Sequence, residues 1–159
     1  MIRLIAATDL NKGLAKNNHI PWRLPEDAKH FRDLTLTNGA NVLMGRKTYE
    51  QLGDDYLSVR HCYISSHQDI KLRDNCRLVN NLENFLKDFK QDIWVIGGSE
   101  IYKATINRAS ELYLTIVQDD FDCDRFFPDY QDFSLIKRDG PNIENSLTYY
   151  YELWQHPAK

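Results

Sequence analysis

The side chain with the most informative surroundings is Asp27, in the first turn of a predicted helix that Pro25 opens. A carboxylate is favoured there by the helix dipole. Phe31 and Leu34, four and seven residues later, place Asp27 on the apolar stripe of that helix. Burial of an acid is costly unless it is paired, and it raises the pKa, so such acids are enriched at functional sites. The alternative is a helix-start aspartate that faces solvent.

A pair of glycines, Gly97-Gly98, lies between a predicted strand and a predicted helix. Glycine lets a ligand approach the main chain closely, and the free N–H groups at the start of a helix favour a phosphate. The pair is neither a GxGxxG fingerprint nor a P-loop. An ordinary tight turn is therefore the alternative.

A second strand-to-helix junction, Gly45-Arg46-Lys47-Thr48, carries two cations. The helix dipole opposes cations at this position, so they favour a bound dianion such as the 2′-phosphate that separates NADPH from NADH. A solvated basic turn is the alternative. Ligands of open α/β sheets bind beyond the carboxyl ends of the strands, so both junctions indicate the same rim.

The segment Asp9–Trp22 is long, largely polar, and directly follows the first predicted strand. Loops of this length in compact domains are often lids or binding loops. A plain surface excursion is the alternative, and composition does not separate the two.

Other chemistries lack the residues they need. The five histidines form no HxxxH or HxH pair, so we expect no metal site. No GxSxG motif is present. The three cysteines, Cys62, Cys76 and Cys123, contain no CxxC pair, which fits a reducing compartment better than a disulfide framework.

The composition is that of a globular protein. With 159 residues and 42% hydrophobic content, the chain can form one domain over residues 1–159 with a real core. The net charge of −3 argues against general nucleic-acid binding. The apolar run at residues 1–8 is too short for a signal peptide or a membrane span, so we expect a cytoplasmic protein.

Strand-length apolar runs alternate with helix-like stretches. The predicted strands are Ile2–Thr8, Asn41–Met44, His61–Ser65, Arg77–Asn80, Ile93–Ile96, Leu112–Gln118, Phe133–Lys137 and Thr148–Trp154. The predicted helices are Glu26–Leu36, Lys47–Leu52, Leu82–Phe89 and Ser99–Asn107. This order predicts an α/β fold with a central, mostly parallel, eight-stranded sheet and about four flanking helices. The last two strands predict an antiparallel edge hairpin that turns through Asp139-Gly140-Pro141.

Taken together, the motifs resemble the dihydrofolate reductase family of the bacterial chromosomal type, in the right order over nearly the whole chain. The segments that carry the resemblance are Ile5-Ala6-Ala7, Pro21-Trp22, Leu24-Pro25-x-Asp27 with Phe31, Met44-Gly45-Arg46-x-Thr48-x-Glu50, Ile96-Gly97-Gly98-x-x-Ile101-Tyr102, Leu112-Tyr113-Leu114-Thr115 and Asp124-x-x-Phe127-Pro128-Asp129-Tyr130. Each motif alone is modest, but so many in register are hard to explain by chance.

The resemblance implies a monomeric enzyme that moves hydride from NADPH to the pterin ring of dihydrofolate. Asp27 would hydrogen-bond the pterin amino group and ring N–H, Thr115 would be linked to it through water, and Trp22 would order water nearby. The pterin and benzoyl rings would be lined by Ile5, Ala6, Ala7, Phe31, Leu52 and Ile96.

The resemblance also implies the cofactor contacts. Arg46, Lys47 and Thr48 would meet the 2′-phosphate and pyrophosphate, and Gly97–Gly98 would be a cis peptide. The loop from Gly13 to Ile20 would close over the nicotinamide. The remaining implied contacts are Ala7, Leu14, Ala15, Asn18, Gly45, Ser65, Ser66, Asn80, Ile96, Ser99, Glu100, Ile101 and Tyr102.

Several positions depart from the family pattern. Leu14-Ala15 replaces Ile-Gly in the lid, Ser99 and Cys123 each stand where a glycine is usual, and Asp54 occupies a place that is often basic. Arg60 is the arginine expected to hold the glutamate tail, but it lies one residue nearer Ser65-Ser66 than usual. Either the strand is shortened there, or Arg60 is not that ligand.

Three other functions are alternatives to the reduction of dihydrofolate. A related reductase of the riboflavin pathway shares the fold and cofactor but reduces a ribosyl pyrimidine, and Asp27 in its Leu-Pro-x-Asp setting argues against it. A non-catalytic NADPH-binding protein would bind cofactor without turnover, which the Asp27–Thr115 pair disfavours. A structural domain would leave both glycine junctions unexplained.

Overall fold

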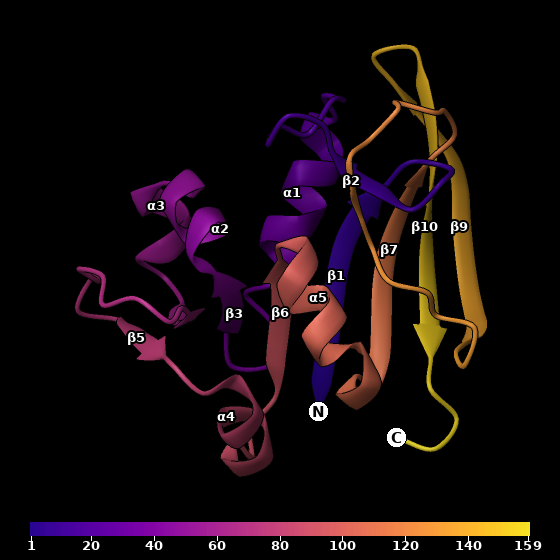
Figure 1. Cartoon of the computed structure of the whole chain (residues 1–159). Helices are drawn as coiled ribbons and strands as arrows, with labels where there is room; N and C mark the ends of the chain where they lie inside the picture. The colour runs from indigo at the N-terminus through magenta and orange to yellow at the C-terminus, as the bar shows by residue number, and fades with distance from the viewer.

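Eight strands form one sheet in the computed structural model, which describes residues 1–159 (Figure 1). Their spatial order is β5-β4-β3-β6-β1-β7-β10-β9. The strands are β1 (Ile2–Thr8), β3 (Asn41–Gly45), β4 (His61–Ser65), β5 (Cys76–Val79), β6 (Ile93–Gly97), β7 (Glu111–Val117), β9 (Ser134–Glu144) and β10 (Leu147–Gln155). Neighbours from β5 to β7 run parallel, and β10 is antiparallel to both β7 and β9. The predicted fold class is therefore confirmed.

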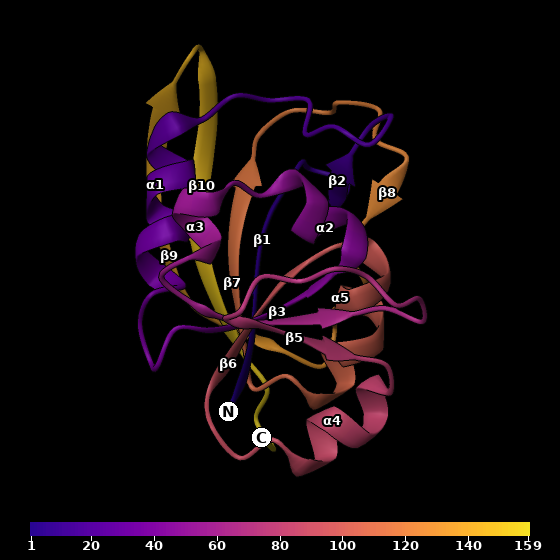
Figure 2. The same ribbon diagram turned by 90° about the vertical axis from the view of Figure 1, so that its left-hand side faces the viewer.

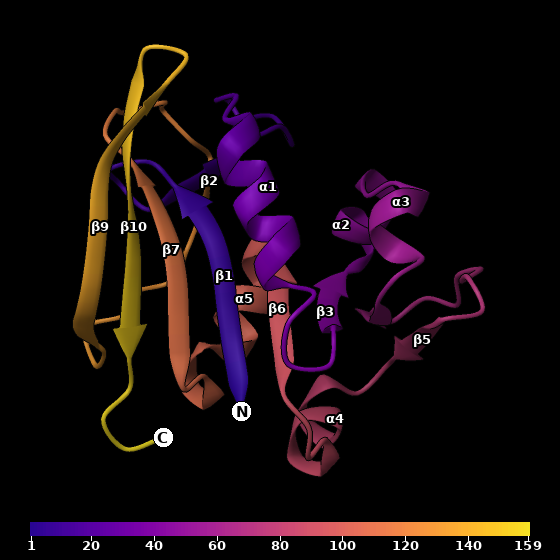
Figure 3. The same ribbon diagram turned by 180° about the vertical axis from the view of Figure 1, so that it is seen from behind.

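Helices cover both faces of this sheet. They are α1 (Pro25–Leu34), α2 (Arg46–Gln51), α3 (Asp54–Leu57), α4 (Leu82–Asp88) and α5 (Ser99–Thr105), which continues into a 3₁₀ turn at Ile106–Arg108. Figures 1 and 3 show α1 and α5 on opposite faces. Four of the five helices match the sequence prediction. The fifth, α3, has only four residues and is too short to show a helical period.

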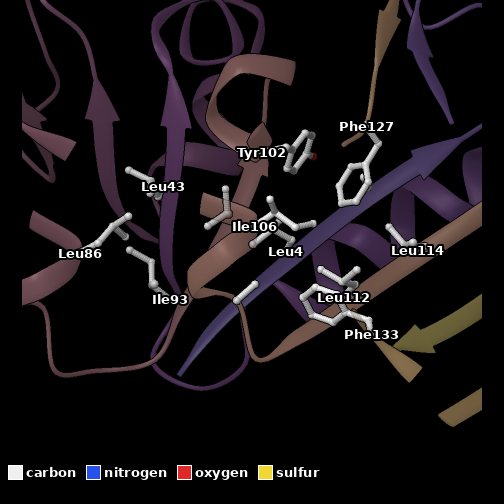
Figure 4. Packing of buried hydrophobic residues seen from close by; sticks show 13 residues of the cluster. Leu4, Leu43, Leu86, Ile93, Tyr102, Ile106, Leu112, Leu114, Phe127 and Phe133 are labelled. Carbon is white, nitrogen blue, oxygen red and sulfur yellow. The ribbon is translucent and has the colours of Figure 1, made fainter. Parts of the chain in front are cut away.

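The two faces of the sheet carry separate apolar clusters. Successive residues of a strand point to opposite faces, so Leu4 belongs to a cluster of 13 buried residues beside α5, whereas Ile5 belongs to one of ten beside α1. Figure 4 shows the first cluster, in which Tyr102 lies over the sheet. Phe31 of α1 packs against the second. This two-sided burial explains why the parallel strands are almost continuously apolar.

The edge hairpin turns at a different place from the one predicted. Its turn is Asn145-Ser146, where both residues have positive φ, 50° and 62°, as a two-residue hairpin turn requires. Residues 139–141 lie inside β9, next to a register shift against β10, and Gly140 has a φ of 134°. The prediction was wrong because the Gly-Pro pair marks a bulge in an edge strand rather than a turn.

A small second sheet pairs β2 (Gly13–Ala15) with β8 (Arg125–Phe126). Neither strand is predicted from the sequence, because two or three residues carry no readable alternation. The pairing joins the segment after β1 to the segment after β7, 110 residues further along the chain. The predicted lid loop is thus attached to a second loop (Figure 2).

Candidate active site

The centre of the candidate site is a hydrogen bond between two side chains that lie 88 residues apart in the chain. Thr115 of β7 donates from Oγ1 to Oδ1 of Asp27 at 2.6 Å. Both residues are buried, with 9% of Asp27 and 5% of Thr115 exposed. Asp27 thus faces the interior as predicted, and the solvent-facing alternative is wrong. The expectation of a water between the two is also wrong, since the contact is direct.

Burial raises the pKa of Asp27 to about 6. Loss of hydration disfavours the charged form, and the Thr115 hydroxyl acts in the opposite direction because it stabilises the carboxylate. The negative charge of Glu144 raises the pKa further. The carboxyl group is therefore poised to exchange a proton near neutral pH, which is what acid–base chemistry needs.

Apolar side chains predicted to line the pocket gather beside Asp27 on the α1 face of the sheet. Ile5 and Ile96 are buried there, and Phe31 and Leu52 pack against the same cluster. Phe31 also stacks on the ring of Tyr56 at a centroid distance of 5.7 Å. The sequence alone did not single out Tyr56, because the four-residue helix α3 that carries it is too short to show a periodic signal.

Of the two other predicted pocket residues, Ala6 points away from this face, whereas Ala7 shares the face of Ile5 and packs against a third cluster. The side chain of Ala6 belongs to the cluster on the opposite face of the sheet, so it does not meet Phe31. Trp22 is buried in a third cluster that also contains Tyr149, with Ala7 packed against it. The centroid of the Trp22 ring lies 5.3 Å from that of the Phe121 ring.

The two glycine junctions meet at one rim, as predicted. Strands β3 and β6 are neighbours, with Met44 opposite Gly97. The Gly97–Gly98 peptide is cis, which confirms the prediction, and the φ of Gly97 is 127°. A Cβ added to Gly97 would lie 3.6 Å from the hydroxyl oxygen of Thr48, and one added to Gly98 would lie 3.8 Å from it. The two junctions thus lie close together, with the side-chain-free backbone of Gly97-Gly98 beside the Thr48 hydroxyl.

Further predicted cofactor residues continue along this rim. Ser65 ends β4 opposite Gly45, and the Ser66 N–H donates to the carbonyl of Val79, just before Asn80. On α2, Lys47 is exposed, and Arg46 forms an ion pair with Glu50 at 2.6 Å. Ser99, Glu100 and Ile101 form the first turn of α5. The buried Tyr102 donates its hydroxyl proton to the carbonyl of Ile5 at 2.6 Å.

The predicted lid loop is held by two aspartates. Asp9 is buried and accepts N–H groups from Asn11, Gly13 and Phe121. Burial opposes ionisation of Asp9, but these N–H groups bring its pKa below the usual value. Asp124 accepts the N–H of Asn17 at 3.0 Å.

The main-chain N–H of Asp124 also donates to the carbonyl of Ala15. Ile20, by contrast, is 63% exposed. Sequence reasoning missed Asp9 as an anchor, although an aspartate two residues before an N–H that it can accept is a known turn signal.

Arg60 is built into the fold near the end of α1. Only 4% of the residue is exposed. Its guanidinium donates to the carbonyls of Tyr56 and Arg32 at 2.6 and 2.7 Å and to the hydroxyl of Thr35 at 3.1 Å. It also lies over the ring of Tyr56 at 3.5 Å. Asp54, in the place that is often basic in the family, pairs with Arg73.

Two kinds of site are not found. No group of three or more His, Cys, Asp or Glu side chains is arranged to hold a metal ion. None of the helices combines the length and apolarity that crossing a membrane requires.

Replacement of Thr115 by valine should raise the pKa of Asp27 further above 6, because valine cannot donate a hydrogen bond to the carboxylate. We expect a shift of about one pH unit, since a hydrogen bond to a charged group contributes about 1.5 kcal/mol. The measurement is a carbon-13 NMR titration of the Asp27 carboxyl. Thr105→Val is the matched control, because Thr105 is buried and donates to main-chain carbonyls instead. An unmoved Asp27 titration would contradict the assigned contact.

Fold and site together define the class of this protein. It is an α/β protein with a buried carboxyl of raised pKa, Asp27, held by β7, and with two glycine junctions that meet at the ends of β3 and β6. The sequence matches the family described as dihydrofolate reductase over residues 1–156. The chain therefore belongs to the dihydrofolate reductase family and is an oxidoreductase.

Individual relatives agree with this assignment. The dihydrofolate reductase of Enterococcus faecium is 32% identical, over 96% of this chain and 95% of the relative. That of Bacillus subtilis is 29% identical, over 100% and 95%. That of Haemophilus influenzae is 38% identical, over 79% and 77%. The family predicted from the sequence motifs is confirmed.

Proposed function

We propose that this protein reduces 7,8-dihydrofolate to 5,6,7,8-tetrahydrofolate, with NADPH as the hydride donor, and so supports one-carbon metabolism. The observation that carries the proposal is Asp27, a buried carboxyl with a pKa of about 6 that is held by Thr115 on the face of the sheet where Ile5, Ile96 and Phe31 pack. A flat heterocycle with adjacent N–H donors is the kind of ligand that such a group recognises, because one carboxylate can accept two parallel hydrogen bonds.

Asp27 has a binding role and a protonation role in this proposal. Its carboxylate would accept hydrogen bonds from the amino group and ring N–H of the pterin. The negative charge in a desolvated pocket would favour protonation of the ring nitrogen next to the carbon that accepts hydride. The reaction consumes one proton, which the Asp27 carboxyl can hold before the ring nitrogen takes it up and leaves the carboxylate behind. The rate should therefore fall as the pH rises through the midpoint of Asp27, near 6, because the site then loses this proton.

The pocket walls would align the rings and exclude water. Ile5, Phe31 and Ile96 present apolar surface on the Asp27 side of the sheet. A dry, preformed pocket strengthens the charge effect of Asp27 and reduces the entropy lost on alignment. We propose that Trp22 orders water near Asp27 and that Leu52 contacts the benzoyl ring.

The cofactor contacts are proposed at the rim of the two junctions. Bound NADPH supplies the hydride. The residues fit such a group, because the bare main chain of Gly97-Gly98 beside the Thr48 hydroxyl offers a cradle that side chains would fill. Arg46 and Lys47 would bind the 2′-phosphate, and Ser65, Ser66 and Asn80 the adenosine side. The loop from Gly13 to Ile20 would cover the nicotinamide.

Replacing Arg46 and Lys47 together with alanine should raise KM for NADPH about 10- to 100-fold, because charged hydrogen bonds to phosphate are lost. KM for NADH should change little, since NADH has no 2′-phosphate. Steady-state kinetics with both cofactors measures this difference. Lys137→Ala on β9 is the control, because Lys137 is an exposed lysine paired with Asp139. An equal rise in both KM values would contradict phosphate recognition by this pair.

The function itself is tested by NADPH oxidation, followed as loss of nicotinamide absorbance with and without dihydrofolate. We expect oxidation only when dihydrofolate is present. Oxidation with a ribosylated pyrimidine but not with dihydrofolate would favour the riboflavin-pathway alternative. Cofactor binding without turnover of either substrate would favour a non-catalytic protein.

A further inference from the structure

The tip of the β9–β10 hairpin contacts the start of α1, the helix that carries Asp27 (Figure 2). Glu144, the last residue of β9, accepts the main-chain N–H of Glu26 through both carboxylate oxygens, at 3.1 and 3.4 Å. The next residue, Asn145, donates from its side-chain amide to the carbonyl of Arg23 at 2.8 Å. These contacts join segments about 120 residues apart, one just before the first turn of α1 and one within it.

The first turn of α1 lacks a cap of its own. Its N-cap residue is Leu24, which makes no side-chain hydrogen bond to the turn. Pro25 follows and has no N–H, so Glu26 supplies the first main-chain donor of the helix. Capping normally comes from a serine, threonine, aspartate or asparagine at the N-cap itself. Here a glutamate from a distant hairpin takes that place, one residue before Asp27.

We propose that Glu144 is a positioning residue for Asp27: it fixes the turn from which the Asp27 carboxyl reaches Thr115 and places a second negative charge beside it. The catalytic part of this inference rests on the proposed function. The contact itself does not rest on that function, because the hydrogen bond from the Glu26 N–H to Glu144 and the burial of Asp27 are present without substrate.

The surroundings of Asp27 make the charge of Glu144 effective. Thr115 is the hydrogen-bond partner on β7, and Tyr149 and Tyr151 of β10 are neutral phenols at neutral pH, with their pKa raised by burial. Tyr151 lies opposite Thr115 in the sheet and stacks on His30 of α1 at 4.0 Å.

The pKa of His30 is lowered by burial, so His30 adds no positive charge at neutral pH. The other charged groups near this turn are Glu26 on α1 and Arg23 in the preceding loop. Neither makes a side-chain ion pair with Asp27 or Glu144. Glu144 is the neighbour that raises the pKa of Asp27 through its charge.

The test compares three variants. Glu144→Gln keeps an oxygen acceptor for the Glu26 N–H and removes the charge, whereas Glu144→Ala removes both. Glu83→Gln is the matched control: Glu83 also lies in the first turn of a helix, α4, which is at the opposite end of the molecule from the hairpin tip (Figures 1 and 3). Each protein is titrated by carbon-13 NMR at the Asp27 carboxyl, without ligand, and its pH–rate profile with dihydrofolate is recorded.

In Glu144→Gln the Asp27 midpoint should fall by about half a pH unit, and the rate above the midpoint by about threefold. High salt should reduce this difference, because it screens a partly exposed charge. Glu144→Ala should show the same shift and, in addition, a KM for dihydrofolate raised by about threefold or more, because the turn that holds Asp27 loosens. Glu83→Gln should superimpose on the wild type.

Asp27 midpoints that coincide in all four proteins would overturn the proposal. A merely structural role would lower thermal stability in Glu144→Ala without moving the midpoint, and that result also counts against it. The NMR titration needs no turnover. A wild-type protein that is inactive on dihydrofolate would therefore contradict the proposed function while the titration still decides the role of Glu144.

Discussion

Asp27→Asn is expected to lower turnover of dihydrofolate at least about 100-fold and, at the same time, to make the protein more stable at neutral pH. Asparagine keeps the size of the side chain and can still accept the Thr115 hydroxyl proton. It cannot carry the negative charge that would favour protonation of the pterin. Loss of activity would therefore follow from lost charge rather than from lost packing.

The stability gain follows from the raised pKa. Asp27 has a pKa of about 6 in the folded protein, against an ordinary value of 3.8 for an aspartate in water. A group whose pKa is raised by folding contributes stability below its unfolded pKa, and that contribution is lost as the pH rises through the folded value. Wild-type stability should thus decline between about pH 4 and pH 6, by about 2–3 kcal/mol. In Asp27→Asn this decline should be absent, with Tm at pH 7 raised by on the order of 5 °C.

Urea unfolding at pH 4 and pH 7, together with the turnover assay, tests both halves of this prediction. Asp33→Asn is the matched control, because Asp33 lies on the same helix but is exposed and paired with Lys29. It should leave turnover unchanged. An Asp27→Asn protein with wild-type turnover would remove the central carboxylate from the proposal. If the free energy of unfolding of Asp27→Asn at pH 7 equals that of the wild type, then burial of the ionised Asp27 carboxylate does not destabilise the protein.

Arg60→Met should both destabilise the protein and weaken binding of the substrate tail. The variant removes the guanidinium that donates to the carbonyls of Tyr56 and Arg32, in a site where 4% of Arg60 is exposed, and leaves the Thr35 hydroxyl with the Tyr56 hydroxyl as its donor. Unsatisfied buried acceptors cost about 1–3 kcal/mol each, so we expect a loss of about 3 kcal/mol and a Tm lowered by about 6–12 °C. Thermal unfolding measures this effect.

A truncated substrate separates the binding role of Arg60 from its structural role. If Arg60 binds the glutamate carboxylate, Arg60→Met should raise KM for dihydrofolate about tenfold or more but leave KM for a dihydropterin without the tail unchanged. An equal rise for both substrates would assign Arg60 a structural role only. Arg108→Met is the control, because Arg108 forms a surface pair with Glu83; surface changes of this kind usually stay within about 0.5 kcal/mol.

The sequence by itself determined the local elements and the face on which Asp27 lies. Apolar runs, helix-start residues and glycine junctions are short-range signals, so the strands of the parallel part of the sheet and four of the helices lie close to their predicted positions. The spacing of Phe31 and Leu34 placed Asp27 toward the core. The motif order was enough to identify the family.

Only the tertiary structure decided which distant groups touch. Thr115 meets Asp27 directly because β7 is the neighbour of β1 in the sheet, and the Thr115 side chain points to the face that α1 covers. Glu144 reaches Glu26 because β9 extends past the bulge at residues 139–141 to the turn at Asn145-Ser146. Arg60 is enclosed by groups from α1 and α3 that have no common sequence pattern. Such contacts depend on sheet order and strand length, which the periodicity of a single segment does not encode.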